Sequence, residues 1–282
     1  MKLGISMWSY VAAARRGLDI PGFIREAHRL GVEGVELLDF FWKDREAELP
    51  AVEAALGETG LAMGVYSVSN NFAQDDPAQR AAQVQVIRDG VDSAVHFGAR
   101  TVRVFAGDVR PGLTFQQVFD WIVAGLREAA DYAHGKGVTL ALENHGTLAG
   151  RSNQVADILD AVGSPALRAN PDTGNFLLVH QAPHEAVARL APRAGMVHFK
   201  DFRAVPDDYA GFAYTSIDGV KFTGQAIGEG EVDLPDCLLS LKAAGFDGWL
   251  NIEYEAEEDP FTGVARSVAN TQRLLTEAGL RA

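Results

Sequence analysis

Short apolar runs alternate with longer amphipathic segments along the chain. The short runs, which predict buried strands, are residues 3–7, 34–38, 61–68, 101–106, 138–142, 167–170, 196–199 and 248–252. Helix-period segments follow them, at residues 19–30, 50–56, 77–97, 115–135, 153–162, 184–190, 234–244 and 263–278. In the fourth of these segments, Phe115, Phe119 and Ile122 recur at spacings of four and three, which predicts one apolar helix face turned toward a sheet.

This strict alternation of eight strands and eight helices predicts a parallel sheet covered by helices. At this length, eight units favour closure into one (β/α)₈ TIM barrel of residues 1–282 over an open sheet. An open sheet would usually bring a glycine-rich loop after its first strand, and residues 6–10 form no such loop. Residues 202–233 form one long connection without predicted elements, where we expect a lid or substrate loop, or else a surface insertion.

Charge and cysteine content narrow the classes of partner. The chain has 25 basic and 38 acidic residues, a net charge of −13, which disfavours nucleic acid and anionic membranes as partners. No stretch approaches the roughly 18 apolar residues of a membrane span. The single cysteine, Cys237, lies in an apolar run and is expected in the core. We therefore expect a cytoplasmic protein.

Polar residues stand where four consecutive predicted strands end. These residues are Glu143, Asp172, His198 and Glu253, and in an α/β barrel such strand ends form the active-site face. Three carboxylates meeting in a partly desolvated mouth would repel one another, and a bound cation removes that cost. Three oxygen ligands and one imidazole suit Mn²⁺, with Mg²⁺, Co²⁺ or Zn²⁺ as alternatives.

Two further residues point to the same mouth by strand parity. His145 lies two residues after Glu143 and Lys200 two residues after His198, so each pair shares a face of an extended strand. His145 is a candidate general acid or base, or else a hydrogen-bonding partner of Glu143. Lys200 is expected to hold a substrate oxygen or to pair with a ligand carboxylate.

Arg203 and Trp8 are the remaining candidates for substrate contact. Arg203 would bind a substrate hydroxyl or carboxylate, unless it is simply solvated. Trp8, with Phe40 after the second strand, would form an apolar wall for a sugar ring. Core packing or a subunit contact explains these aromatic residues equally well.

The strand-end motifs resemble those of a known superfamily. They are Leu142-Glu143-Asn144-His145, Asp172-Thr173-Gly174-Asn175, His198-Phe199-Lys200-Asp201, Gly228-Glu229-Gly230-Glu231-Val232-Asp233 and Ile252-Glu253-Tyr254-Glu255. Together they are similar to the xylose-isomerase-like TIM-barrel superfamily of sugar isomerases and epimerases. That superfamily includes tagatose 3-epimerase, inosose dehydratase and barrel subunits that cleave oxidised C-glycosides.

The resemblance implies a mechanism in which both glutamates, Glu143 and Glu253, are metal ligands and proton carriers. One glutamate removes a proton beside a carbonyl and the other returns it on the opposite face, while the metal stabilises the enediolate. The sequence departs from the epimerase pattern at Asn175, where those enzymes have a substrate-binding histidine.

The leading prediction is therefore a metal-dependent sugar isomerase or epimerase acting on a small sugar or polyol. A lyase or dehydratase on the same metal site is the first alternative, because β-elimination also begins with proton removal beside a carbonyl. A catalytically silent sugar-binding barrel is the second. The resemblance also implies a homo-oligomer, either a dimer or a tetramer.

Overall fold

Eight parallel strands form a ring in the computed structural model, which describes residues 1–281. Their order around the ring is β6-β5-β4-β3-β2-β1-β11-β7, and bridges from Ala169 to Ala194 and from Asp172 to His198 join its two ends. The predicted (β/α)₈ barrel is thereby confirmed. The strands are β1 (Lys2–Ser6), β2 (Gly34–Leu38), β3 (Ala62–Ser67), β4 (Thr101–Val104), β5 (Thr139–Glu143), β6 (Leu167–Asn170), β7 (Met196–Phe199) and β11 (Trp249–Ile252).

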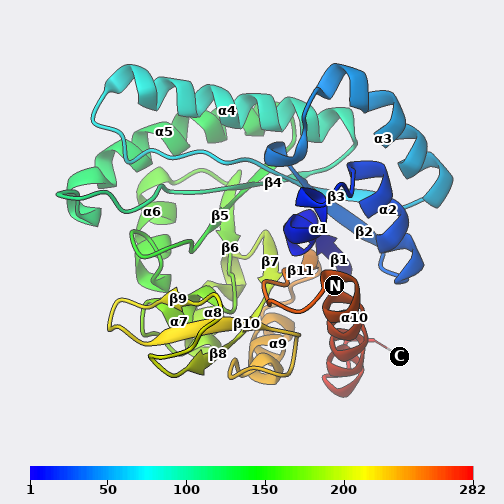
Figure 1. Ribbon diagram of the computed structural model, residues 1–282. Helices are drawn as coiled ribbons and strands as arrows, with labels where there is room; N and C mark the ends of the chain where they lie inside the picture. Colours follow the sequence, from blue (N-terminus) through cyan, green and yellow to red (C-terminus); the bar gives the residue numbers. More distant parts are fainter. Residues whose placement is uncertain (282) are drawn as a thin grey trace.

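Helices surround this ring (Figure 1). The main ones are α2 (Ile20–Arg29), α3 (Arg45–Thr59), α4 (Pro77–His96), α5 (Phe115–Gly135), α6 (Ser152–Val162), α8 (Pro183–Leu190), α9 (Leu234–Ala243) and α10 (Pro260–Glu277). Short helical pieces stand between them, namely η1 (Met7–Tyr10), α1 (Val11–Arg15), η2 (Asp39–Phe41), α7 (Asn175–Leu178) and η3 (Ala191–Arg193). Among the described residues, no helix has both the length and the apolar character to cross a membrane.

Helix α3 is longer than the sequence predicted. Its predicted range was residues 50–56, with a proline at the first position, where proline is tolerated because its missing N–H is not needed there. In the structure α3 begins at Arg45, since Asp44 accepts a hydrogen bond from the N–H of Ala47 at 3.2 Å. That cap stabilises the first turn and leaves Pro50 inside the helix.

The prediction of a connection without elements after β7 was wrong. Residues 201–225 contain β8 (Asp201–Val205), β9 (Tyr214–Thr215) and β10 (Lys221–Gln225), which form an antiparallel sheet in the order β8-β10-β9. Figure 1 shows this small sheet, in yellow, outside the ring. Its strands are short and mix polar with apolar residues, so no apolar run marks them in the sequence.

Asp201 fixes the return of this connection toward α9. Its carboxylate accepts hydrogen bonds from the N–H groups of Gly228 and Gly230, both at 2.9 Å, and of Val232 at 3.1 Å. A Cβ atom at position 230 would lie 2.2 Å from an Asp201 oxygen, so only glycine allows this close approach. Asp201 therefore ties the connection to the end of β7, beside Lys200.

Apolar residues fill the inside of the ring toward the amino ends of its strands, and the carboxyl ends are left polar. Trp249 packs against Val65, Ala141 and Met196 there, and a Cβ at Gly34 would lie 2.5 Å from its ring. Cys237 is fully buried, as expected of a core residue. Because apolar side chains close the other end of the ring, buried polar side chains gather at the carboxyl ends of the strands.

Candidate metal centre and active site

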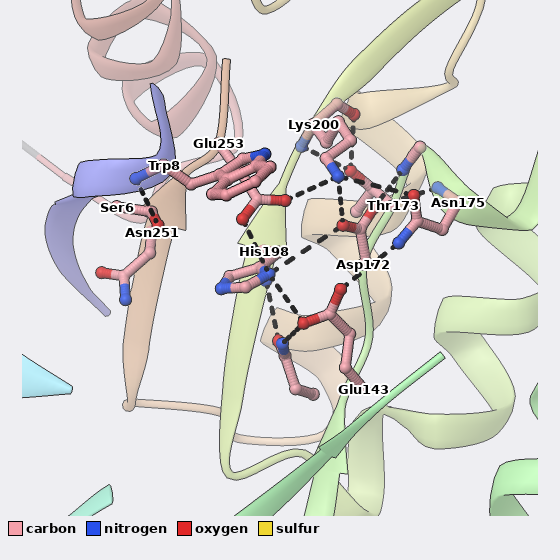
Figure 2. A network of polar contacts seen from close by, with 12 residues as sticks. Ser6, Trp8, Glu143, Asp172, Thr173, Asn175, His198, Lys200, Asn251 and Glu253 are labelled. Atoms are coloured by element: carbon pink, nitrogen blue, oxygen red, sulfur yellow. Dashed lines mark hydrogen bonds and ion pairs between the residues drawn. The ribbon is translucent and has the colours of Figure 1, made fainter. Parts of the chain in front are cut away.

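Four side chains converge at the carboxyl ends of β5, β6, β7 and β11. Glu143, Asp172, His198 and Glu253 each place one ligand atom within 4.8 Å of the others, and Figure 2 shows these side chains turned toward one another. The Nδ1 atom of His198 lies 3.2 Å from Glu143, 3.6 Å from Glu253 and 3.9 Å from Asp172. All four residues are buried. The structure thus brings together the four ligands predicted from the sequence.

Two atoms of this cluster are buried without a well-aligned hydrogen bond among the described residues. They are Nδ1 of His198 and Oδ2 of Asp172, and each is in ion-pair contact instead, Nδ1 with Glu143 at 3.2 Å and Oδ2 with Lys200 at 2.9 Å. A divalent cation would offer both atoms a directed bond. The donor set of three carboxylates and one imidazole therefore fits a divalent metal ion.

The turn after β6 aims Asp172 at the cluster. Its Oδ1 accepts hydrogen bonds from the N–H groups of Gly174 and Asn175, both at 2.9 Å, so Oδ2 is left to face inward. The Asn144 side chain holds the Asp172 backbone from both sides, accepting from its N–H at 2.7 Å and donating to its carbonyl at 3.1 Å. The carboxylate orientation is therefore set before any ligand binds.

Glu36 belongs to the site but was not predicted from the sequence. Both of its carboxylate oxygens lie 3.0 Å from Nε2 of His198. Ser67 donates to the same carboxylate at 2.5 Å, and Asn251 donates at 2.8 Å. A carboxylate on Nε2 keeps that nitrogen protonated and turns Nδ1 toward the metal position. The available signal was a lone glutamate in a strand that is otherwise apolar, Gly34–Leu38.

Arg103 is a second missed residue, on β4. Its Nε lies 3.3 Å from Glu143, and one of its terminal nitrogens donates to the Val68 carbonyl at 2.8 Å. The guanidinium also stands 3.9 Å from the centre of the Phe105 ring. Only 3% of Arg103 is exposed, so its charge is directed at Glu143. A single arginine among apolar strand residues was the sequence signal.

Burial and charge move the pKa values of these groups in opposite directions. Burial alone would raise the pKa of Glu143, but His198 and Arg103 outweigh it and hold that pKa well below its usual range. For Asp172, burial together with the charges of Glu143 and Glu253 raises the pKa to about 7 although Lys200 opposes the shift. Burial would lower the pKa of His198, and the surrounding glutamates raise it well above its usual value instead. Without a metal, His198 therefore carries a positive charge inside the cluster.

A cavity of about 410 Å³ opens at the cluster. Besides the ligands Glu143 and Glu253, four more of the predicted residues line it, namely Trp8, His145, Asn175 and Lys200. Arg203 lies elsewhere: it is exposed on β8, and its guanidinium donates to the backbone carbonyl of Glu229. The structure therefore does not bring Arg203 to the cavity where the prediction placed it.

Lys200 and Asn175 link the ligand carboxylates across the cavity. The Lys200 ammonium lies 2.6 Å from Glu253, 2.9 Å from Asp172 and 3.3 Å from Glu255. The Asn175 amide donates to Glu143 at 3.3 Å, and its oxygen lies 3.4 Å from the Lys200 ammonium. Each glutamate ligand thus has its own hydrogen-bond donor at the cavity surface.

His145 lies at the rim of the cavity. Its ring packs on Phe105 with centroids 4.3 Å apart, and its Nδ1 faces Asp108 at 3.8 Å. Its side chain is 43% exposed. A histidine in this position can exchange protons with solvent and with a bound molecule.

A (β/α)₈ barrel with a buried three-carboxylate, one-histidine cluster at its strand ends defines a TIM barrel with a candidate divalent-metal centre. Comparison with known families gives the more particular assignment. The chain belongs to the xylose isomerase-like TIM barrel family, whose model matches residues 24–275.

Similar proteins include sugar epimerases. L-ribulose-5-phosphate 3-epimerase UlaE of Salmonella paratyphi C is 27% identical over 252 residues, covering 84% of this chain and 80% of that protein. A xylose isomerase-like TIM barrel protein of Mycobacterium smegmatis, crystallised with magnesium, is 18% identical with a TM-score of 0.76, covering 99% of this chain and 98% of that one. D-allulose 3-epimerase of Methylomonas sp. is 17% identical with a TM-score of 0.76 and 98% coverage of both chains. The two structural likenesses show the fold.

Proposed function

We propose that this protein is a divalent-metal-dependent isomerase or epimerase that acts on a small keto sugar or polyol derivative. The observation that carries the proposal is the buried cluster of Glu143, Asp172, His198 and Glu253, in which a histidine nitrogen and a carboxylate oxygen make no well-aligned hydrogen bond. The similarity to L-ribulose-5-phosphate 3-epimerase over most of the chain supports the same class of reaction.

Glu143, Asp172, His198 and Glu253 would hold the ion, with Mn²⁺ as the preferred metal because three oxygen donors accompany one imidazole. When bound, the ion supplies Lewis acidity that stabilises negative charge on the substrate carbonyl oxygen as the enediolate forms. The same residues would accept Mg²⁺, Co²⁺ or Zn²⁺ less well.

Glu143 and Glu253 are the proposed proton carriers. They come from β5 and β11 and approach His198 from opposite sides (Figure 2). One carboxylate would take the proton from the carbon beside the carbonyl, and the other would return it on the opposite face. Asn175 and Lys200 hold these carboxylates in place and are the proposed donors to the substrate oxygens.

A lyase reaction on the same centre is the second candidate, and His145 is the observation that favours it. This histidine lines the cavity beyond Glu143 and faces Asp108, where it can protonate a departing hydroxyl or alkoxide. Elimination and epimerisation share the first proton transfer, so the products distinguish them. A barrel that only binds sugars would give neither product.

Metal analysis and isotope exchange test the proposal together. The purified protein should contain about one divalent ion per chain, and chelation should abolish turnover. Incubation with ketoses and keto-inositols in D₂O should then place deuterium beside the carbonyl, as mass spectrometry and NMR would show. Epimerase activity gives an inverted product, and lyase activity gives an unsaturated product with release of water. The absence of both metal and deuterium incorporation would refute the proposed function.

A further inference from the structure

The cations that line the cavity already face carboxylates. Lys200 lies within 3.3 Å of both Glu253 and Glu255, and Arg103 lies 3.3 Å from Glu143. Both cations are 3% exposed. If a metal ion took over part of the charge of Glu253, Lys200 would still keep Glu255 as its partner.

The third basic group of the cavity is also compensated. His145 faces Asp108 at 3.8 Å, and Asp108 is exposed at the rim. A phosphate group carries nearly two negative charges at neutral pH and is normally bound by arginine, lysine or free backbone N–H groups. In this cavity it would have to compete with a carboxylate for every cationic side chain of the lining.

Most of the remaining cavity lining is apolar or aromatic. The residues of this wall are Trp8, Leu38, Phe40, Phe105, Leu178 and Tyr214. Trp8 is held in one orientation because its indole N–H donates to Glu255 at 2.5 Å, and the Phe40 ring meets it edge to face at 5.7 Å.

Phe40 is unusual among these wall residues because it is 57% exposed. It stands on η2, directly after β2, and lines the cavity. Large apolar side chains at the rim of a polar site commonly contact an apolar part of the ligand. The cavity of about 410 Å³ lies within the roughly 300–1,000 Å³ of pockets that accept drug-sized ligands, so there is room beyond a sugar ring.

We propose that the end of the substrate remote from the metal carries an uncharged apolar group, alkyl or aryl, and no phosphate. This inference rests on the proposed function and assigns the substrate class of the same site. The ligand cluster would bind the carbonyl end, and the wall formed by Trp8, Phe40 and Phe105 would receive the apolar group. This substrate class differs from a sugar phosphate such as the one that gives L-ribulose-5-phosphate 3-epimerase its name.

A matched substrate panel tests the inference. The manganese-loaded protein is given 2-ketohexoses in three forms: unmodified, as 6-phosphates and as 6-O-phenyl ethers. Deuterium exchange gives kcat/KM, and calorimetric titration gives Kd without requiring turnover. We expect the phenyl ethers to exceed the unmodified sugars by about tenfold and the phosphates to fall below them by about tenfold in both measurements.

A pair of variants localises the effect. Phe40→Ser should lower kcat/KM for the phenyl ether by about tenfold and so remove most of its advantage over the unmodified sugar. Leu239→Ser removes a similarly exposed apolar side chain, 49% exposed on α9, and should leave both substrates unchanged. Circular dichroism and light scattering of both variants check folding and subunit association.

The outcomes separate the inference from the function on which it rests. Phosphates that are the best substrates would overturn the inference while supporting the proposed function. A Phe40→Ser protein that loses subunit association but keeps its preference for the phenyl ether would also overturn it, since Phe40 would then contact a second copy. If no form exchanges deuterium, the proposed function fails, and the calorimetric ranking alone decides which remote group the cavity accepts.

Discussion

The two halves of the barrel contribute different things to the site. Strands β5, β6, β7 and β11 carry every residue of the candidate metal cluster at or just after their carboxyl ends. Strands β1, β2 and β4 are followed instead by aromatic residues of the cavity lining, namely Trp8, Phe40 and Phe105. Under the proposed function, one half therefore carries the chemistry, and the other shapes the space for the substrate.

The two halves meet through two ion pairs, one across the inside of the ring and one between neighbouring strands. Glu36 on β2 contacts His198 on β7, and Arg103 on β4 contacts Glu143 on β5. The wall half thus orients the ligand half without supplying a ligand. Substitution of a candidate metal ligand should stop the reaction, whereas substitution of Glu36 or Arg103 should weaken metal binding.

Glu253→Gln should have the largest effect. The amide keeps the shape of the side chain but cannot carry a proton, so kcat should fall by about 10³-fold or more. The exposed control Glu46→Gln on α3 should be close to wild type. Steady-state kinetics measures the loss, and a thermal unfolding curve checks the fold. Near-normal turnover in Glu253→Gln would exclude its role as a proton carrier.

Glu36→Gln probes the link between the halves. Loss of the negative charge beside Nε2 of His198 should lower the affinity for the divalent ion by about 10- to 100-fold. Calorimetric titration of the metal-free variant with Mn²⁺ measures this directly. Excess metal should restore much of the activity, which a simple loss of folding would not allow. An affinity within twofold of wild type would show that His198 needs no such partner.

Metal binding should weaken as pH falls below about 7. The pKa of Asp172 is raised to about 7 mainly by burial, so its carboxyl group is protonated at lower pH and a cation must displace that proton. Because this group ionises at about 3.8 when unfolded, the metal-free protein should lose stability as pH rises through 7. The increase in Tm caused by Mn²⁺ should therefore be larger at pH 8 than at pH 5. A constant increase across this range would contradict the assigned pKa.

Arg203→Ala should have the smallest effect. Its guanidinium contacts the Glu229 backbone on the outer sheet, so kcat/KM should change by less than about twofold, within roughly 0.5 kcal/mol. Lys200→Met, which removes the cation beside Glu253 and Glu255, serves as the contrasting variant and should lower kcat/KM far more. A large loss in Arg203→Ala would show that the outer sheet moves toward the cavity during turnover.

The regular part of the fold was predictable because each barrel strand is a short apolar run beside an amphipathic helix. The four ligands were predictable because each stands within two residues of the carboxyl end of such a run. Glu36 and Arg103 lie inside their strands, where parity alone does not tell whether a polar side chain enters the ring. Arg203 was misplaced because β8 turns away from the ring to pair with β10, and no local pattern marks that turn.

The position of β11 has a consequence for the order in which the chain becomes functional. This strand inserts between β1 and β7. It is followed by Glu253 and by Glu255, which accepts a hydrogen bond from Trp8, just after the first strand. During synthesis the N-terminal strands emerge first, yet the ring has an open gap and the metal cluster lacks a ligand until residue 253 is made. A prematurely terminated chain would therefore have an exposed strand edge and an incomplete metal site. Only a chain that includes β11 and Glu253 would bind the metal with all four candidate ligands.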